Sequence, residues 1–446
     1  MGTPPRHPVT APPQTPRVPP LAPAAAPSSF VALQHRNFRL LWTGQLVSFS
    51  GTMMQSAAIL WHVSLLVPGD RKALALGMVG LVRIVPIVVF SLVSGVVADV
   101  LDRRKLMLAT QTIMAIFAGI LALLTVHGLH AVWPIYLLAA FGSAAAAFDG
   151  PARQSLIPNL VPRAHLANAI SLNTIMSQLA SVAGPSLAGV VIALLGVAWA
   201  YLLNAASFLV VIAALLLMRN VRANGTPERE AGSDPAAGGD QPAAISLHAA
   251  LEGLRFVFSA DMIRATMLLD FFATFFSSAT ALLPIFAQDI LHVGAHGYGW
   301  LYAAPSVGAL VASGGMVPLV DRIDRRDRVL LWAVGAYGAA TVVFGVSRSF
   351  WLTFVCLALT GAADTVSMVL RNIIRQMTTP DRLRGRMTSV NMIFFMGGPQ
   401  LGELEAGLVA NWVGAPLSVV SGGLGCLAAT AVVAAATPAL RRYRRD

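Results

Sequence analysis

Charged residues are scarce in this chain. Of its 446 residues, 11% are Asp, Glu, Lys or Arg, whereas 56% are hydrophobic, and the mean hydropathy is +0.70. A soluble domain carries about 25% charged residues, so the composition excludes an ordinary soluble fold. A lipid bilayer can accommodate this much apolar surface. The apolar runs are long and uninterrupted, which predicts an all-α membrane protein and excludes a β-barrel with alternating strands.

Cysteine and the common catalytic motifs are also nearly missing. The two cysteines, Cys356 and Cys426, lie within apolar runs, which argues against disulfides and thiol metal sites. There is no phosphate-binding glycine loop, metal-ligand cluster or nucleophile elbow. We therefore expect no metal, no cofactor and no enzymatic activity. A membrane enzyme would need a reactive cluster in an interfacial loop, and the longest loop, 219–250, has none.

The hydrophobic runs predict twelve transmembrane helices. They lie at about 38–67, 74–98, 106–126, 132–150, 165–195, 198–218, 262–290, 297–320, 329–347, 351–370, 385–411 and 415–437. The Pro- and Ala-rich start has no signal-peptide core and predicts a disordered cytoplasmic tail. The predicted order is this tail (1–35), a six-helix bundle (36–218), a linker with an interfacial helix (219–258), a second bundle (259–440) and a basic tail (441–446).

The two predicted bundles share an internal repeat. A charged turn after the second span contains Asp99, Asp102, Arg103 and Arg104, and a matching turn contains Asp321, Asp324, Arg325 and Arg326. A second constant spacing relates Arg153, Pro162, Ser171, Asn173, Gly184 and Gly189 to Arg371, Pro380, Ser389, Asn391, Gly402 and Gly407. Such duplication predicts two pseudo-symmetric six-helix bundles.

The net charge of +11 is distributed unevenly. If the twelve spans are correct, every Lys and Arg lies on one side except Arg71, Lys72, Arg83 and Arg348. Positive residues concentrate on the cytoplasmic side of membrane proteins, so both termini are expected in the cytoplasm. Five tryptophans at the opposite span ends agree (Trp133, Trp199, Trp300, Trp351 and Trp412). The basic residues thus indicate topology and lipid contact, and no nucleic-acid partner is expected.

The charged turns resemble the signature of the major facilitator superfamily, Gly-x-x-x-Asp-(Arg/Lys)-x-Gly-(Arg/Lys)-(Arg/Lys). Gly95, Asp99, Arg103 and Arg104 match it in the first turn, where Val100 and Asp102 depart from it. The second turn keeps the basic residue as Arg322 and has Asp324 in place of glycine. The resemblance implies that the Asp99 turn clamps the two halves on the cytoplasmic side. Otherwise it is an ordinary loop, in which Asp102 is placed to cap the next helix.

Other stretches are similar to the enterobactin-exporter-like branch of that superfamily. They are Phe38-Arg-Leu-Leu-Trp-Thr-Gly-Gln45, Phe148-Asp-Gly-Pro-Ala-Arg-Gln154, Ala281-Leu-Leu-Pro-Ile-Phe-Ala287 and Gly402-Glu-Leu-Glu-Ala-Gly407. Gly184, Pro185 and Gly189 also resemble the Gly-Pro-x-x-Gly-Gly motif of antiporters, which implies export. The alternative is a structural kink, since proline removes a helical hydrogen bond.

Five ionisable residues fall well inside predicted spans, away from their ends: Arg83, Asp270, Asp364, Glu403 and Glu405. A charge at a helix centre costs about 2.5–3.5 kcal/mol on insertion scales, so we expect these residues to have a use. We predict that Asp270 and either Glu403 or Glu405 exchange protons, with Arg83 as a charge partner or substrate contact. Static pairing between helices is the alternative. Asp149 and Arg153 are predicted to form a structural pair.

Taken together, the sequence predicts a multi-pass secondary transporter of the bacterial inner membrane. It is expected to act as a monomer and to export a small amphipathic molecule, a siderophore or a drug-like compound. The resemblance implies alternating access, and the buried acids suggest a proton gradient as the energy source. An importer or facilitator of the same fold and a lysophospholipid flippase remain alternatives.

Overall fold

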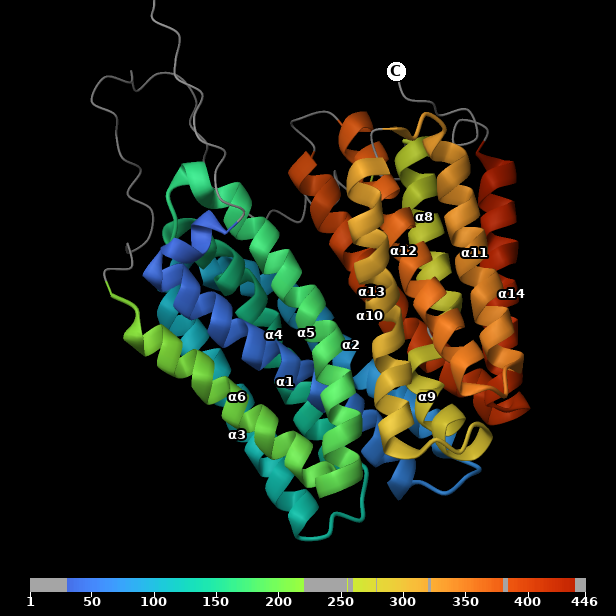
Figure 1. Ribbon diagram of the computed structural model, residues 1–446, viewed down its shortest axis with the longest axis horizontal. Helices are drawn as coiled ribbons and strands as arrows, with labels where there is room; N and C mark the ends of the chain where they lie inside the picture. Colours follow the sequence, from blue (N-terminus) through green and yellow to red (C-terminus); the bar gives the residue numbers. More distant parts are fainter. Residues whose placement is uncertain are drawn as a thin grey trace, which may run out of the picture.

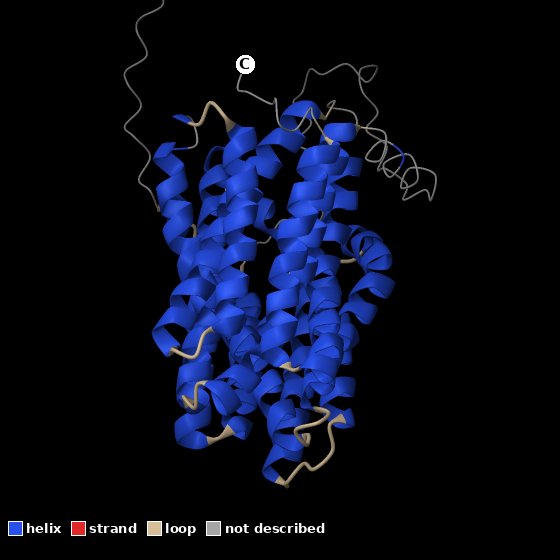
Figure 2. Cartoon of the chain, turned by 90° about the vertical axis from the view of Figure 1, so that its right-hand side faces the viewer, coloured by secondary structure: helices blue, strands red, loops and turns tan. Residues whose placement is uncertain are grey.

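The computed structural model describes residues 30–219, 255, 260–277, 279–319, 322–379 and 384–437. Figure 2 shows that these residues form helices joined by short loops, and no strand occurs among them. The predicted linker 219–258 with its interfacial helix and the basic tail 441–446 lie almost wholly outside the described residues. Within the predicted N-terminal tail, Val31–Gln34 form a 3-10 helix, and the Ala32 amide donates to Asn168 Oδ1 at 3.0 Å.

Six long helices form the N-terminal half of the chain. They are α1 (Arg36–Leu66), α2 (Lys72–Val100), α3 (Arg103–Val126), α4 (Trp133–Leu156), α5 (Leu166–Leu195) and α6 (Val197–Leu217). Between α4 and α5 lie two short 3-10 helices, Ile157–Asn159 and Arg163–His165. Helix α4 therefore continues through Pro151, beyond the predicted end of its span at residue 150.

The C-terminal half begins with a broken helix. Helix α8 (Asp261–Phe276) is followed by the 3-10 helix η4 (Ala279–Leu282), a single turn α9 (Leu283–Ile285) and the π-helix η5 (Phe286–Ile290). Pro284 lies in this segment, and proline cannot donate the backbone hydrogen bond that a regular helix needs. The continuous helix predicted over 262–290 is thus wrong in detail, although the whole segment is long and apolar enough to cross a membrane.

The remaining helices are regular. They are α10 (Gly294–Leu319), α11 (Arg326–Val346), α12 (Phe350–Thr378), α13 (Arg384–Val413) and α14 (Ala415–Ala436). Helix α12 continues two turns beyond its predicted end at residue 370. Among the described residues, nine helical segments are long and apolar enough to span a membrane, which confirms a multi-pass membrane protein.

The two halves contact each other mainly through two helix pairs, α2 with α13 and α5 with α10, and α1 and α2 also touch the segment from η4 to α10. Within the N-terminal half, α1 packs on α5 and α6, and α3 packs on α4 and α6. Within the C-terminal half, α10 packs on α12, and α11 packs on α12 and α14. We call the end where α1 begins and α14 ends the terminal end, and the other the opposite end. In Figure 1 the halves diverge towards the terminal end.

The apolar core explains this arrangement. One cluster of buried residues joins both halves, and it includes the last turns of α1 (Ala57–Val63) and the first turns of α2 and α10 (Leu76 and Tyr298). Three other clusters each lie within one half, one in the N-terminal half and two in the C-terminal half. The shared core therefore holds the halves together at the opposite end.

Glycines permit the close approach of the two halves. A Cβ atom at Gly77 of α2 would lie 2.9 Å from Gly407 Cα of α13, and one at Gly299 of α10 would lie 2.6 Å from Gly189 Cα of α5. The internal repeat relates the two contacts, because Gly299 corresponds to Gly77 and Gly407 to Gly189. Small residues let membrane helices pack backbone to backbone. The same glycine-to-glycine contact therefore occurs twice between the two halves.

Candidate functional site

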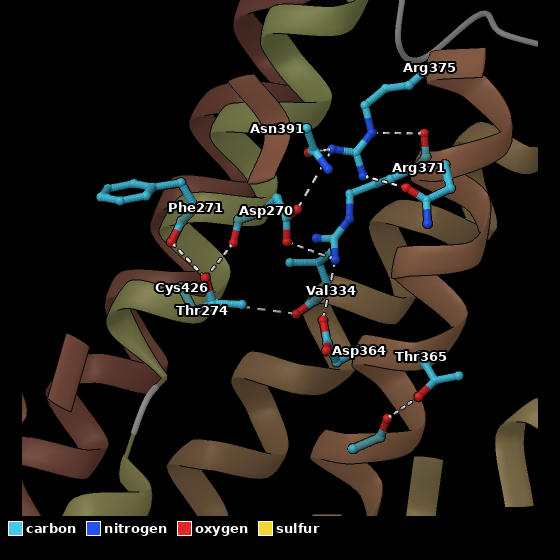
Figure 3. Close-up of polar contacts among 12 residues, drawn as sticks. Asp270, Phe271, Thr274, Val334, Asp364, Thr365, Arg371, Arg375, Asn391 and Cys426 are labelled. Atoms are coloured by element: carbon cyan, nitrogen blue, oxygen red, sulfur yellow. Dashed lines mark hydrogen bonds and ion pairs between the residues drawn. The ribbon is translucent and has the colours of Figure 1, made fainter. Parts of the chain in front are cut away.

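A buried cluster of charged side chains lies within the C-terminal half (Figure 3). Asp270, on α8, faces two arginines of α12. Arg371 Nη2 is 2.9 Å from Asp270 Oδ1, and Arg375 Nη1 is 3.8 Å from Asp270 Oδ2. The side chains of Asp270 and Arg371 are 3% and 1% exposed. Asp270 therefore pairs between helices, which was the alternative to the predicted proton exchange, and its partners are two arginines that the prediction did not include. The proton exchange itself stays a prediction.

Asp364 belongs to the same cluster. The Arg371 Nη2 atom that contacts Asp270 also donates to Asp364 Oδ1 at 3.2 Å. The two carboxylates thus share one nitrogen of one guanidinium. The other two nitrogens of Arg371, Nε and Nη1, are buried and have no hydrogen-bond partner among the described residues.

Arg375 is held more completely. Its Nε donates to the Arg371 carbonyl at 3.2 Å, its Nη2 donates to Asn372 Oδ1 at 3.0 Å, and its Nη1 donates to Asn391 Oδ1 of α13. The cluster contains two guanidinium groups and two carboxyl groups. Their formal charges cancel when both carboxyl groups are ionised, which lowers the cost of burying the four groups.

A cavity of about 120 Å³ adjoins Asp364. Its polar lining comes from hydroxyl groups of the segment after α8 and of α11 and α12, namely Ser277, Thr280, Tyr337, Thr341 and Thr360. The Asp364 side chain is 38% exposed, and it lines this cavity. The described residues contain no cluster of His, Cys, Asp or Glu that could hold a metal ion.

Arg371 and Arg375 are the residues that sequence reasoning missed. The sequence placed them in a loop, because span ten was predicted to end at residue 370. The helix continues to Thr378, so both side chains are buried inside the protein, and they do not belong to the exposed basic side. Their spacing could have revealed them. Asp364, Arg371 and Arg375 are seven and four residues apart, which puts them on one face of a helix.

The equivalent arginine of the N-terminal half has a neutral partner. Arg153 Nη1 donates to Gln45 Oε1 of α1 at 3.4 Å and lies over the Phe49 ring. Asp149, predicted to pair with Arg153, instead accepts from Thr110 Oγ1 at 3.0 Å and Gln111 Nε2 at 2.9 Å on α3. The prediction of an Asp149–Arg153 pair was wrong, because the Asp149 side chain is oriented towards α3.

Glu403, Glu405 and Arg83 lie apart from this cluster. Glu403 of α13 packs on Gly80 of α2, where an added Cβ would lie 2.9 Å from the glutamate Cβ. Glu403 is buried, and its Oε2 has no hydrogen-bond partner among the described residues. Arg83 lies one turn beyond Gly80 on α2 and forms no ion pair with Glu403. Glu405 is half-buried on another face of α13, as the two-residue spacing predicts.

The first charged turn organises the terminal end of the N-terminal half. Asp102 Oδ1 accepts from the Arg104 and Lys105 amides at 2.9 and 3.3 Å, which confirms the predicted helix cap on α3. Arg103 and Arg104 donate to the carbonyls of Ser155 and Leu216, near the ends of α4 and α6. Positively charged side chains at the C-terminus of a helix donate to backbone carbonyls that have no partner within the helix. Asp99 and Gly95 both belong to helix α2, and the structure does not describe their surroundings beyond that.

The second turn has a different local structure. Asp321 lies outside the described residues, and Arg322 and Asp324 are exposed. Arg325 precedes α11, which has no side-chain cap, and Arg326 is buried with Nη1 3.7 Å from Met377 Sδ. These contacts lie within the C-terminal half. The predicted clamp between the halves stays a prediction.

The glycines of the antiporter-like motif lie at helix contacts. A Cβ at Gly184 would lie 2.5 Å from Met53 Cβ of α1, and Gly189 faces Gly299 of α10 across the two halves. Helix α5 is continuous through Pro185. The motif therefore has a clear packing role, and its link to transport direction stays a prediction.

Comparison with known proteins gives a consistent result. A family described as transmembrane secretion effector, MFS_3, matches residues 27–443. The chain is 29% identical to the enterobactin exporter EntS of Escherichia coli O1:K1 over 357 residues, 79% of this chain and 81% of the relative. It is 27% identical to the multidrug efflux pump Tap of Mycolicibacterium fortuitum over 384 residues, 84% of this chain and 89% of the relative.

Solved structures show the same fold at lower identity. A bacterial homologue of the human lysosomal transporter Spinster, in an inward-facing conformation, has a TM-score of 0.70 and 15% identity, and covers 92% of this chain and 99% of its own. An inward-facing bacterial homologue of the iron transporter ferroportin has a TM-score of 0.65 and 18% identity, with coverage of 92% and 99%.

Proposed function

The chain belongs to the transmembrane secretion effector family of the major facilitator superfamily, and from this premise we propose that it exports a small amphipathic organic molecule by proton antiport. The cargo class is a siderophore or a drug-like compound. The observation that carries the proposal is the similarity to both an enterobactin exporter and a multidrug efflux pump over about four fifths of this chain.

The proposed mechanism is alternating access between two six-helix bundles with twelve spans in all. The paired contacts Gly77–Gly407 and Gly189–Gly299 support it, because they join the two halves at one end. Rocking about such a repeated interface would open one end while closing the other. The state described here has the opposite end closed.

We place both termini in the cytoplasm of a bacterial cell, with the opposite end facing outward. The positive residues of the terminal end support this orientation. The same residues suit contact with anionic lipids. Transport needs no cofactor in this proposal, since the proton gradient supplies the energy and the ionisable residues inside the spans supply the coupling.

Inside-out membrane vesicles test direction and coupling together. Vesicles from cells producing the protein are given enterobactin or ethidium, and their lumen is acidified. We expect each transported probe to accumulate in the lumen, and the ionophore nigericin to abolish the accumulation by collapsing the pH difference. Vesicles without the protein are the control. Accumulation that ignores nigericin would contradict proton antiport, and loss of preloaded probe under the gradient would indicate an importer.

A further inference from the structure

We propose that Asp364 carries the coupling proton, and that Arg371 alternates between sharing its guanidinium with two carboxylates and binding Asp270 alone. This inference rests on the proposed proton antiport, and it assigns the proton to a residue other than Asp270, Glu403 or Glu405. Its basis is the contact geometry of the cluster, the cavity beside Asp364 and the unused donors of Arg371.

The contacts distinguish the two aspartates. Asp270 has both arginines within ion-pair distance, whereas Asp364 has Arg371 alone. A proton on Asp270 would leave Arg375 without a carboxylate within 4.0 Å among the described residues. A proton on Asp364 leaves Arg371 and Arg375 both next to Asp270. Asp364 is therefore the carboxyl group whose protonation leaves no buried guanidinium without a carboxylate.

The cavity gives Asp364 a route for a proton. Asp270 is 3% exposed, whereas Asp364 is 38% exposed and lines the 120 Å³ cavity. A cavity needs only about 10–15 Å³ of such volume to hold a water molecule, so this one has room for several. The hydroxyl groups of Ser277 and Thr280 also line it. Water there would bind these hydroxyls and reach Asp364.

The unused donors of Arg371 supply the second state. Its Nη2 is divided between Asp270 at 2.9 Å and Asp364 at 3.2 Å, while Nε and Nη1 have no partner among the described residues. When a hydronium ion gives its proton to Asp364, water is released and the ion pair with Arg371 is lost. Arg371 can then bind Asp270 with two nitrogens, which is the stronger geometry. Loss of the proton reverses the step.

Among the described titratable groups around Asp364, no second carboxyl group lines the cavity. Tyr337 faces it from α11, Cys426 from α14, and Asp270 from α8, with Arg371 and Arg375 on its own helix. Cys426 Sγ already donates to the Val334 carbonyl at 3.9 Å. In the N-terminal half, the equivalent Arg153 meets the neutral Gln45, so the repeat provides a copy of the contact without a carboxyl group.

Proteoliposomes containing the full-length protein provide the test, with ethidium and enterobactin as probes. Two modes are measured: accumulation driven by an acidic lumen, and exchange of labelled for unlabelled probe at equal pH. We expect Asp364→Asn to reduce driven accumulation to the level of protein-free liposomes and to retain exchange. Asp364→Glu should retain driven accumulation with a changed pH midpoint. Thr365→Val, whose hydroxyl donates only to the Gly361 carbonyl of its own helix, should behave like the wild type.

A measurement without cargo accompanies these assays. Spin labels at the exposed positions Lys105 and Asp324 report the separation of the halves at the terminal end as a function of pH. The separation should depend on pH in the wild type and lose this dependence in Asp364→Asn, with elution from a sizing column confirming that the variant is folded.

Three results would overturn the inference. They are driven accumulation by Asp364→Asn at the wild-type level, loss of both modes in a folded Asp364→Asn protein, and a pH dependence in Asp364→Glu identical to that of the wild type. A wild-type protein that exchanges probe but ignores the gradient would contradict proton antiport itself. The failure of the proposed function can therefore be distinguished from the failure of the Asp364 assignment.

Discussion

At the scale of single residues, the duplicated charged turn shows how one register shift changes the role of an aspartate. Asp102 directly precedes the first residue of α3, so its carboxylate reaches two free amides of the first turn. Asp324 lies one residue further from the start of α11, where Arg325 occupies the cap position. The first copy therefore stabilises a helix start, and the second leaves its aspartate exposed.

The cap can be tested by Asp102→Ala. Loss of an N-cap side chain costs about 0.5–2 kcal/mol, so the melting temperature in detergent should fall. Asp102→Asn keeps an acceptor oxygen and should retain most of the stability. Substitution of the exposed Asp324 by alanine is the matched control, with little expected change. Equal melting of Asp102→Ala and the wild type would show that the cap has no measurable effect.

At the scale of elements, the broken segment from α8 to η5 connects two features of the molecule. Its first part carries Asp270, and its π-helix carries Gln288 and Asp289, which reach the other half. Gln288 Nε2 donates to Ser64 Oγ of α1 at 2.7 Å, and Lys72 Nζ lies 3.1 Å from Asp289 Oδ2. π-Helical turns are frequent at functional sites. This one presents two consecutive polar side chains to the N-terminal half.

The Lys72–Asp289 contact should favour the state in which the opposite end is closed. A partly exposed ion pair contributes about 0–1 kcal/mol, so Asp289→Ala should shift the ratio of closed to open states by up to about fivefold. The exchange of both charges (Lys72→Asp with Asp289→Lys) should restore part of the shift. Spin-label distances across the opposite end measure the ratio. If the effect of the double exchange equals the sum of the effects of Lys72→Asp and Asp289→Lys measured separately, the ion pair does not stabilise the closed state.

At the scale of the whole molecule, the two glycine contacts join the halves where any side chain would collide with a backbone. Gly299→Ala would place Cβ 2.6 Å from Gly189 Cα, so the closed opposite end should become less favourable. Overpacking typically costs about 1–3 kcal/mol. We expect slower transport of a working probe and a smaller closed population. Gly314→Ala is the control on the same helix, because its Cβ would meet no atom within 4 Å.

The orientation of the whole molecule can be measured by cysteine labelling in spheroplasts. Cysteines placed at His130 and Arg348, exposed at the opposite end, should react with a membrane-impermeant maleimide. Cysteines at Lys105 and Asp324, exposed at the terminal end, should react only after permeabilisation. Cys356 and Cys426 are buried, which keeps the background low. Labelling of Lys105 and Asp324 positions from different sides would rule out the duplicated architecture.

The amino-acid sequence by itself determined that this is a helical membrane protein surrounded by lipid. Scarce charge and long apolar runs require a bilayer, and the repeated turns and glycines indicate duplication. These properties are local or periodic, so they can be read without knowing any contact. The helix starts, the Asp102 cap and the family resemblance follow from the same kind of information.

Only the tertiary structure decided which charges meet. Asp270 and Arg371 are far apart in the chain and come from different helices, and their pairing depends on how α8 packs beside α12. The prediction that Asp149 pairs with Arg153 failed for the same reason, because neighbours in sequence were oriented towards different helices. Inside a membrane the partner of a charge is set by helix packing, and packing is a property of the folded chain.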